Sequence, residues 1–134
     1  MMKKDEALER AFPVCDPGVY PLGSRILVQI RTPETKSKGG IILTDSDKDT
    51  EMWNTTVAKV LALGPLAFHN RDTLKMWPEK QWCGVNDYVR VPKYGGDRWV
   101  STNKEGEKAY YILINDLDVL AKVTTNPLEI KAFF

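Results

Sequence analysis

The sequence predicts an all-β protein, a small barrel or sandwich of short strands with little helix. Short apolar stretches rich in Val, Ile, Leu and Tyr recur after residue 24, and clusters of Gly, Pro, Asn and Asp separate them. The chain has 134 residues, of which 43% are hydrophobic. That length and composition are sufficient for one domain with a buried core.

The first 20 residues predict an N-terminal extension ahead of that domain. Residues 3–11 have the pattern of a short amphipathic helix, which Pro13, Pro17 and Gly18 would end. The basic residues near the start are not followed by an apolar stretch, so the segment lacks the features of a secretory signal. The sequence therefore favours a cytoplasmic protein.

Six strands are predicted in the rest of the chain. In residues 26–30, Ile26, Val28 and Ile30 alternate with Leu27 and Gln29, which is the period of a strand. Residues 65–84 lack a clear period and predict either a hairpin or a long excursion. The other predicted strands are residues 57–64, 85–91, 98–100, 110–114 and 118–123.

The polar segment 32–56 is long for a connection in a small domain, and loops of that length are usually functional or disordered. It contains the aliphatic triplet Ile41, Ile42 and Leu43, which follows the glycine pair at positions 39 and 40. The triplet is either a short core strand or a docking motif that becomes ordered in an apolar groove. Its flanks favour the docking motif, because the glycines oppose a fixed conformation and the following TDSDKDTE offers little to pack.

The energetics of such a motif imply that several copies act together. Burying three aliphatic side chains gains on the order of 5–9 kcal/mol. Ordering about five to eight loop residues costs about 1–2 kcal/mol each, which nearly cancels that gain. One loop should therefore bind weakly, and useful affinity requires an oligomer that meets a multivalent partner.

Charge and cysteine content argue against several other classes of protein. The net charge of +1 gives no electrostatic case for nucleic acid or an anionic membrane, and no apolar stretch approaches the ~18–20 residues of a transmembrane helix. Cys15, Cys83 and His69 are far apart and lack the spacing of a metal site or of a nucleophilic catalyst. We therefore expect no cofactor and no enzymatic activity.

Two further patterns indicate a binding site but have plainer explanations. A set of tryptophans (Trp53, Trp77, Trp82 and Trp99) could stack on the bases of a single-stranded nucleic acid, but the scattered charges favour core or interface positions. Residues 45–49 resemble a calcium loop without the Gly and distal Glu of an EF-hand, which favours a solvated loop.

Several segments resemble, in order along the chain, the GroES-type co-chaperonins. PLGSRILVQ followed by ETKSKGGIIL resembles the start of that family and its loop motif, in which ETKS and two glycines precede an aliphatic tripeptide. VAKVLALG, VNDYVRV and INDLDVLAKV resemble three later strands of the family. The resemblance covers residues 21–123.

This resemblance implies a partly open GroES-like β-barrel with a long mobile loop (residues 32–56) and a roof segment (residues 65–84). The barrel domain would span residues 21–126, between the extension (residues 1–20) and a C-terminal tail (residues 127–134). The implied protein is a heptameric, non-enzymatic lid for a GroEL-type chaperonin. The lid encloses an unfolded substrate protein for folding that depends on ATP, which the chaperonin binds.

The resemblance also assigns roles to individual residues. By position, Ile41, Ile42 and Leu43 would contact the chaperonin, and Gly39 and Gly40 would act as the loop hinge. Subunits of the family join edge to edge through their first and last strands. Here that implies an interface formed by Ile26, Val28, Ile30, Val119, Ala121 and Val123.

The departures from the family pattern matter as well. Ala58 and Asn86 replace family glycines, and Asn also tolerates a positive φ. The roof segment is the least similar part, and such divergence is typical of phage-encoded members, which would act in the host cytoplasm. Two alternatives stay open: a small β-barrel that binds single-stranded nucleic acid, and a fragment related to the GroES-like domain of zinc alcohol dehydrogenases.

Overall fold

The computed structural model describes residues 8, 10–32, 56–92 and 96–128. Within these residues, helix is confined to one turn near residues 8–11 and to the 3-10 helix η1 (Asp116–Asp118). The all-β prediction is therefore confirmed. The strands are β1 (Arg25–Ile30), β2 (Val57–Leu63), β3 (Tyr88–Arg90), β4 (Asp97–Thr102), β5 (Lys108–Asn115) and β6 (Ala121–Lys122).

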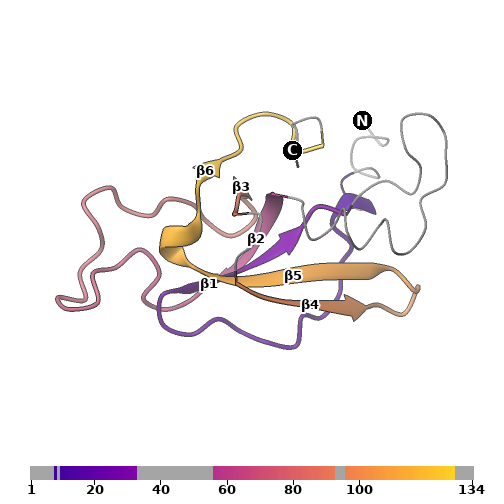
Figure 1. The fold of residues 1–134 in the computed structure, drawn as a ribbon, viewed down its shortest axis with the longest axis horizontal. Coiled ribbons are helices and arrows are strands. Elements are labelled where there is room, and N and C mark those ends of the chain that lie inside the picture. The colour runs from indigo at the N-terminus through magenta and orange to yellow at the C-terminus, as the bar shows by residue number, and fades with distance from the viewer. Residues whose placement is uncertain (1–7, 9, 33–55, 93–95, 129–134) are drawn as a thin grey trace.

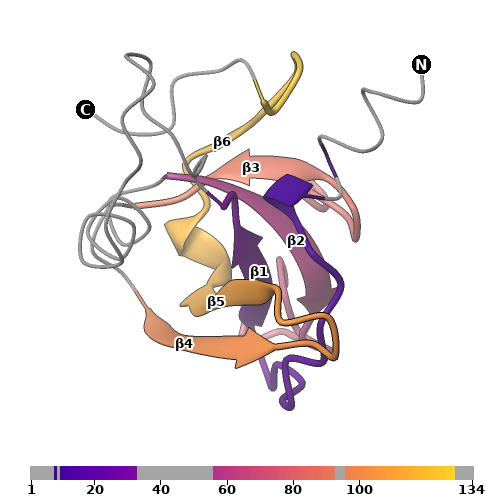
Figure 2. The same cartoon turned by 90° about the vertical axis from the view of Figure 1, so that its right-hand side faces the viewer.

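The six strands form one antiparallel sheet in the order β4-β5-β1-β2-β3-β6. β1 lies inside the sheet, because it pairs with β2 on one side and with β5 on the other. The sheet curves so that β3 and β4 lie on opposite sides of the molecule (Figures 1 and 2). β4 and β6 remain as its two edges, which is the arrangement of a partly open barrel.

The inner face of the curved sheet holds the main core. Ile26, Val28 and Ile30 of β1 are completely buried there, as their alternation predicts. Burying one such aliphatic side chain stabilises the fold by roughly 1.5–3 kcal/mol. Residues of the other elements that complete this core include Val60, Phe68, Val89, Val91, Ile112, Ile114 and Val119.

The outer face of the sheet carries a second, smaller apolar cluster. Leu27 and Gln29 of β1, which alternate with the core residues, are also only 2% and 3% exposed. The reason is that residues 13–17, which we call the strap, pack across this face, and the Gln29 side chain donates to the Pro13 carbonyl at 2.8 Å. In Figure 1 the N-terminal segment runs along the sheet beside β4.

Four strands differ from their predicted boundaries by more than one residue at one end or at both. Residues 85–91 shorten to β3, because Asn86 takes a positive φ of 76° in a turn and its N–H donates to the Val60 carbonyl. Residues 118–123 shorten to β6, because η1 occupies the preceding residues. β4 and β5 are longer than predicted. They pair with each other from Asp97 opposite Leu113 to Thr102 opposite Lys108, across a turn at residues 103–107, and β5 continues to Asn115 beside β1.

The roof segment is an excursion with its own small core. Its chain folds back on itself through an antiparallel bridge between His69 and Met76. Phe68, Trp77 and Trp82 pack against one another with ring centroids 4.9–5.9 Å apart. In Figure 1 this segment projects from one end of the sheet.

One buried carboxylate joins the roof segment to the barrel. Phe68 is completely buried and has a positive φ of 63°, a conformation that non-glycine residues rarely adopt. Its backbone N–H donates to Asp116 Oδ2 at 2.9 Å, and the Asp116 N–H donates to the Ser24 carbonyl. Asp116 thus holds the start of the roof segment against the start of β1.

We predict that Asp116→Ala lowers the free energy of unfolding by about 2–3 kcal/mol, because it leaves the buried Phe68 N–H without an acceptor. Asp116→Asn keeps an acceptor oxygen at the same position and should cost about 1 kcal/mol or less. Urea denaturation followed by tryptophan fluorescence measures both. Equal losses in the two variants would contradict the role of this hydrogen bond.

Candidate functional site

The predicted docking residues lie outside the part of the chain that the structure describes. These are Gly39, Gly40, Ile41, Ile42 and Leu43. The structure does describe the two stems from which residues 33–55 begin and end, Thr32 and Thr56. The geometry of the candidate site is therefore the geometry of these stems.

The two stems lie side by side. They follow β1 and precede β2, which pair antiparallel with Ile30 opposite Ala58. The pairing continues to the base of the loop, where the Arg31 N–H donates to the Val57 carbonyl at 3.0 Å. Residues 33–55 therefore leave and re-enter the sheet at one place.

The second stem is anchored in the sheet. Thr56 is buried, and its carbonyl accepts the Val91 N–H at 2.8 Å. The Thr56 hydroxyl lies 3.0 Å from Arg90 Nη2, which donates to it. This stem is held through both its main chain and its side chain.

Segments near both chain ends hold the first stem. The Thr32 N–H donates to the Ala11 carbonyl at 2.7 Å. Arg31 Nη1 donates to the Pro127 carbonyl, also at 2.7 Å. Residues that the sequence places in an extension and a tail thus meet at the base of the predicted loop.

The predicted interface residues fall into two groups. Ile26, Val28 and Ile30 belong to the subunit's own core, and β1 has no free edge because both of its sides are paired. Within the single chain these three side chains have no exposed surface, and their part in a subunit interface stays a prediction. A period of two identifies a buried face without saying whether its strand lies at an edge of the sheet.

The other group lies at the edge formed by β6. Val119 and Val123 are buried within the subunit, whereas Ala121 is exposed. Two large side chains beside it, Leu117 and Leu120, are 68% and 67% exposed. Leu120 lies in the predicted strand 118–123, whereas Leu117 stands between two Asp residues, where a single apolar residue carries no periodic signal.

A second exposed apolar group precedes β1. Val19, Tyr20 and Leu22 are exposed, although a strand begins three residues after Leu22. Clusters of exposed apolar side chains mark contact surfaces more often than catalytic sites. The described surface thus has two groups of exposed apolar side chains, one before the first strand and one around the last strand.

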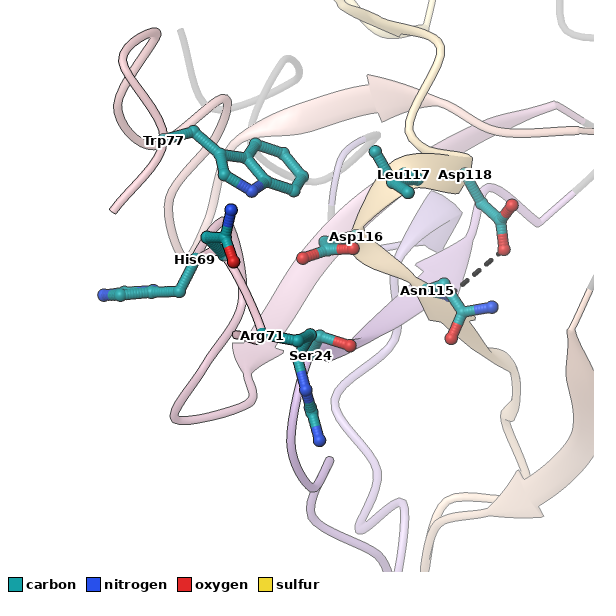
Figure 3. Close-up of a pocket in the computed structure, with 9 residues that line it drawn as sticks. Ser24, His69, Arg71, Trp77, Asn115, Asp116, Leu117 and Asp118 are labelled. Atoms are coloured by element: carbon teal, nitrogen blue, oxygen red, sulfur yellow. Dashed lines mark hydrogen bonds between the residues drawn. The ribbon is translucent and has the colours of Figure 1, made fainter. Parts of the chain in front are cut away.

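A surface pocket of about 490 Å³ lies between the roof segment and η1. Trp77 and Asp116 lie on facing sides of it, and the His69 ring points away from Asp116 (Figure 3). The buried Asp116 carboxylate already accepts the Phe68 N–H, and His69 Nδ1 lies 2.8 Å from the Ala67 carbonyl. These polar groups are engaged in holding the roof segment, which gives the pocket a structural explanation.

The cysteines do not form a reactive site. Both are free thiols, and burial raises the pKa of the Cys83 thiol to about 11. Burial also raises the pKa of Cys15. Both thiols are therefore protonated near neutral pH, whereas nucleophilic attack requires the thiolate. Among the described residues, no group of three His, Cys, Asp or Glu side chains is placed to hold a metal ion.

The described tryptophans do not form a stacking platform. Trp77 and Trp82 pack on Phe68 and on each other, and Trp99 packs near Tyr111 with its indole N–H donating to the Pro17 carbonyl at 2.9 Å. Trp53 lies outside the described residues. Bases stack on exposed aromatic faces, so this arrangement disfavours the nucleic-acid alternative.

A family model and a known protein that match this chain belong to the same family. The family model of the chaperonin 10 kDa subunit matches residues 18–123. The co-chaperonin GroES of Lactobacillus acidophilus is 33% identical over 104 residues, which covers 77% of this chain and 96% of that protein. In the described part of the chain, no helix has the length and apolar character needed to cross a membrane.

These matches confirm the predicted family. They also support the expectation that the protein is not an enzyme, since this family is not enzymatic. The match begins after the strap and ends at the last residue of the predicted closing strand, so the strap lies outside the family pattern. The chain belongs to the GroES-type co-chaperonin family, that of the chaperonin 10 kDa subunit.

Proposed function

We propose that this protein is a ring-shaped lid for a GroEL-type chaperonin, acting in the cytoplasm. Residues 32–56 would act as the mobile loop of the family and place Ile41, Ile42 and Leu43 in an apolar groove of the chaperonin. Gly39 and Gly40 would act as its hinge. Capping would enclose an unfolded substrate protein while the chaperonin binds and hydrolyses ATP.

The observation that carries this proposal is the base of the loop. Its stems lie side by side in paired strands, and hydrogen bonds from four different parts of the chain hold Arg31, Thr32 and Thr56. A firm base supports docking, because the conformational cost of binding then falls on the loop residues beyond the stems. It also keeps every loop at the same place on its subunit.

The same energetics require several loops to act together. The gain from burying three aliphatic side chains is nearly cancelled by ordering the residues around them. Several loops on one ring raise the effective concentration of each further loop once the first has bound. The energetics favour an oligomer, and the resemblance to the GroES-type family implies that it is a heptamer that faces a ring of matching docking sites.

The ring contact that we propose joins the two groups of exposed apolar side chains, one beside β6 and one before β1. β6 is an edge strand, with Ala121 exposed and Leu117 and Leu120 beside it. The complementary surface would be the segment before β1, which exposes Tyr20 and Leu22. Such a head-to-tail contact joins unlike surfaces, which is the type that closes into rings. Val119 and Val123 would support the edge from within the subunit.

The chaperonin contact predicts that Ile42→Asp abolishes co-migration with a GroEL-type ring in the presence of ATP. A carboxylate in an apolar groove should weaken association by at least about 100-fold. The matched control is Ser46→Asp, which adds the same charge to the same loop outside the triplet and should still co-migrate. Sizing chromatography measures both. Unimpaired binding of Ile42→Asp would contradict the docking role.

The ring contact predicts that Leu120→Lys dissociates the oligomer, because it places a charge in a buried contact. Sedimentation should find the wild-type chain of 15.2 kDa as a discrete heptamer and the variant as smaller species. Val14→Lys changes a side chain that is even more exposed, at 87%, and should leave the oligomer intact. A variant Leu120→Lys that remains a heptamer would place the contact elsewhere.

A further inference from the structure

The strap is held to the sheet in an unusual way. Each of its five consecutive carbonyl groups accepts a hydrogen bond from a side chain of the sheet or of its connecting turn. The pairs are Gln29 Nε2 to Pro13 O at 2.8 Å, Asn103 Nδ2 to Val14 O at 3.2 Å, Tyr111 Oη to Cys15 O at 3.1 Å, Ser101 Oγ to Asp16 O at 2.8 Å and Trp99 Nε1 to Pro17 O at 2.9 Å.

The donors contact the main chain of the strap rather than its polar side chains. The side chains of Val14 and Asp16 are exposed, whereas Pro13 is buried and Cys15 belongs to the outer apolar cluster. Proline-containing segments bind aromatic-lined grooves in this manner, because an extended chain with fixed φ loses little entropy on binding. The strap therefore has the chemistry of a bound peptide ligand.

The surface below the strap has the chemistry of a groove. Tyr111 is completely buried and Trp99 lies beside it, with ring centroids 5.6 Å apart. Burial raises the pKa of Tyr111 to about 12, so its hydroxyl is protonated and able to donate near neutral pH. Without the strap, this cluster of Leu27, Trp99 and Tyr111 would face solvent.

We propose that the outer face of β1, β5 and β4 is a peptide-binding groove, and that its ligand is the strap of a second copy of this chain as well as the chain's own. The groove binds a segment with five free carbonyl groups, a small side chain at position 15 and prolines at positions 13 and 17. Every copy of the chain carries this pattern. Straps of two copies are chemically identical, so the five donors cannot distinguish a neighbour's strap from the strap of the same chain.

A strap that binds a second copy must release the connection to β1, in which the Tyr20 hydroxyl donates to the Leu63 carbonyl at 3.3 Å. Residues 18–20 are exposed, and Gly18 has a positive φ of 79° with no atom within 4 Å of where a Cβ would lie. The family assembles into oligomers, so neighbouring straps would be present at high local concentration. The proposal does not depend on the chaperonin, because both partners are copies of this chain.

The first experiment tests the groove with a cut chain. A protease site is inserted between Gly18 and Val19 in the full chain, which is folded and then cleaved, and a fluorescent peptide of residues 8–18 is added. We expect saturable exchange of the labelled peptide into the groove. Trp99→Phe in the protein should weaken binding about 3–10-fold, the value of one hydrogen bond.

Peptide variants define the specificity. Val14→Ser in the peptide should bind within about twofold of the original, because that side chain points to solvent. Cys15→Glu should fail to bind, because that side chain packs on the apolar cluster. Equal binding of a proline-free scrambled peptide would overturn the proposal and indicate a non-selective apolar surface, and so would the absence of any exchange.

The second experiment uses intact chains and tests the second copy directly. Wild-type chains, which carry Cys15, are mixed with tagged Cys15→Ser/Glu107→Cys chains and treated with a short thiol cross-linker. Cys15 Sγ lies 3.6 Å from the Glu107 carbonyl in the docked strap, so a strap bound in trans gives a cross-linked pair of chains on a denaturing gel. Asp97→Cys, at the far end of β4, replaces Glu107→Cys in the control and should give none. The absence of a pair with Glu107→Cys would overturn exchange between copies.

Discussion

The first strand of the barrel is paired on both edges and buried on both faces. β5 and β2 take up its main-chain hydrogen bonds, the core takes up Ile26, Val28 and Ile30, and the outer cluster takes up Leu27. Strands with such surroundings are usual in sheets covered on two sides, whereas a small antiparallel barrel commonly leaves one face to solvent. The outer face therefore requires a cover, and the strap provides it.

β1 contacts the strap and also leads into the base of residues 33–55. β1 begins beside Asp116, which fixes the roof segment. It leads into Arg31 and Thr32, which donate hydrogen bonds to segments near both termini. Interactions at β1 or beside it thus position three irregular parts of the chain. These are the strap, the roof segment and the stem at Thr32. This coupling fixes the position of Arg31 and Thr32 relative to the roof segment without requiring regular secondary structure in either chain end.

The sequence predicted the features that depend on local pattern. Alternation at Ile26, Val28 and Ile30 identified a buried strand, and Asn86 was expected to tolerate the positive φ that it adopts. The pattern failed where long-range contacts decide. Nothing near Leu27 or Gln29 in sequence indicates that residues 13–17 cover them, and the exposed Leu120 became visible only when β6 was found at an edge. The docking triplet is predicted from the sequence, and the structure describes only the stems of its segment.

The position of the strap in the chain has a consequence for folding. Its partners lie far along the sequence, with 82 residues separating Pro17 from Trp99 and 96 separating Cys15 from Tyr111. Contacts at such separation form late, because the cost of closing the intervening chain must be met first. The strap precedes all six strands in the chain and is therefore among the last segments to reach its place. Until then, a chain of this co-chaperonin family exposes an apolar face of its own.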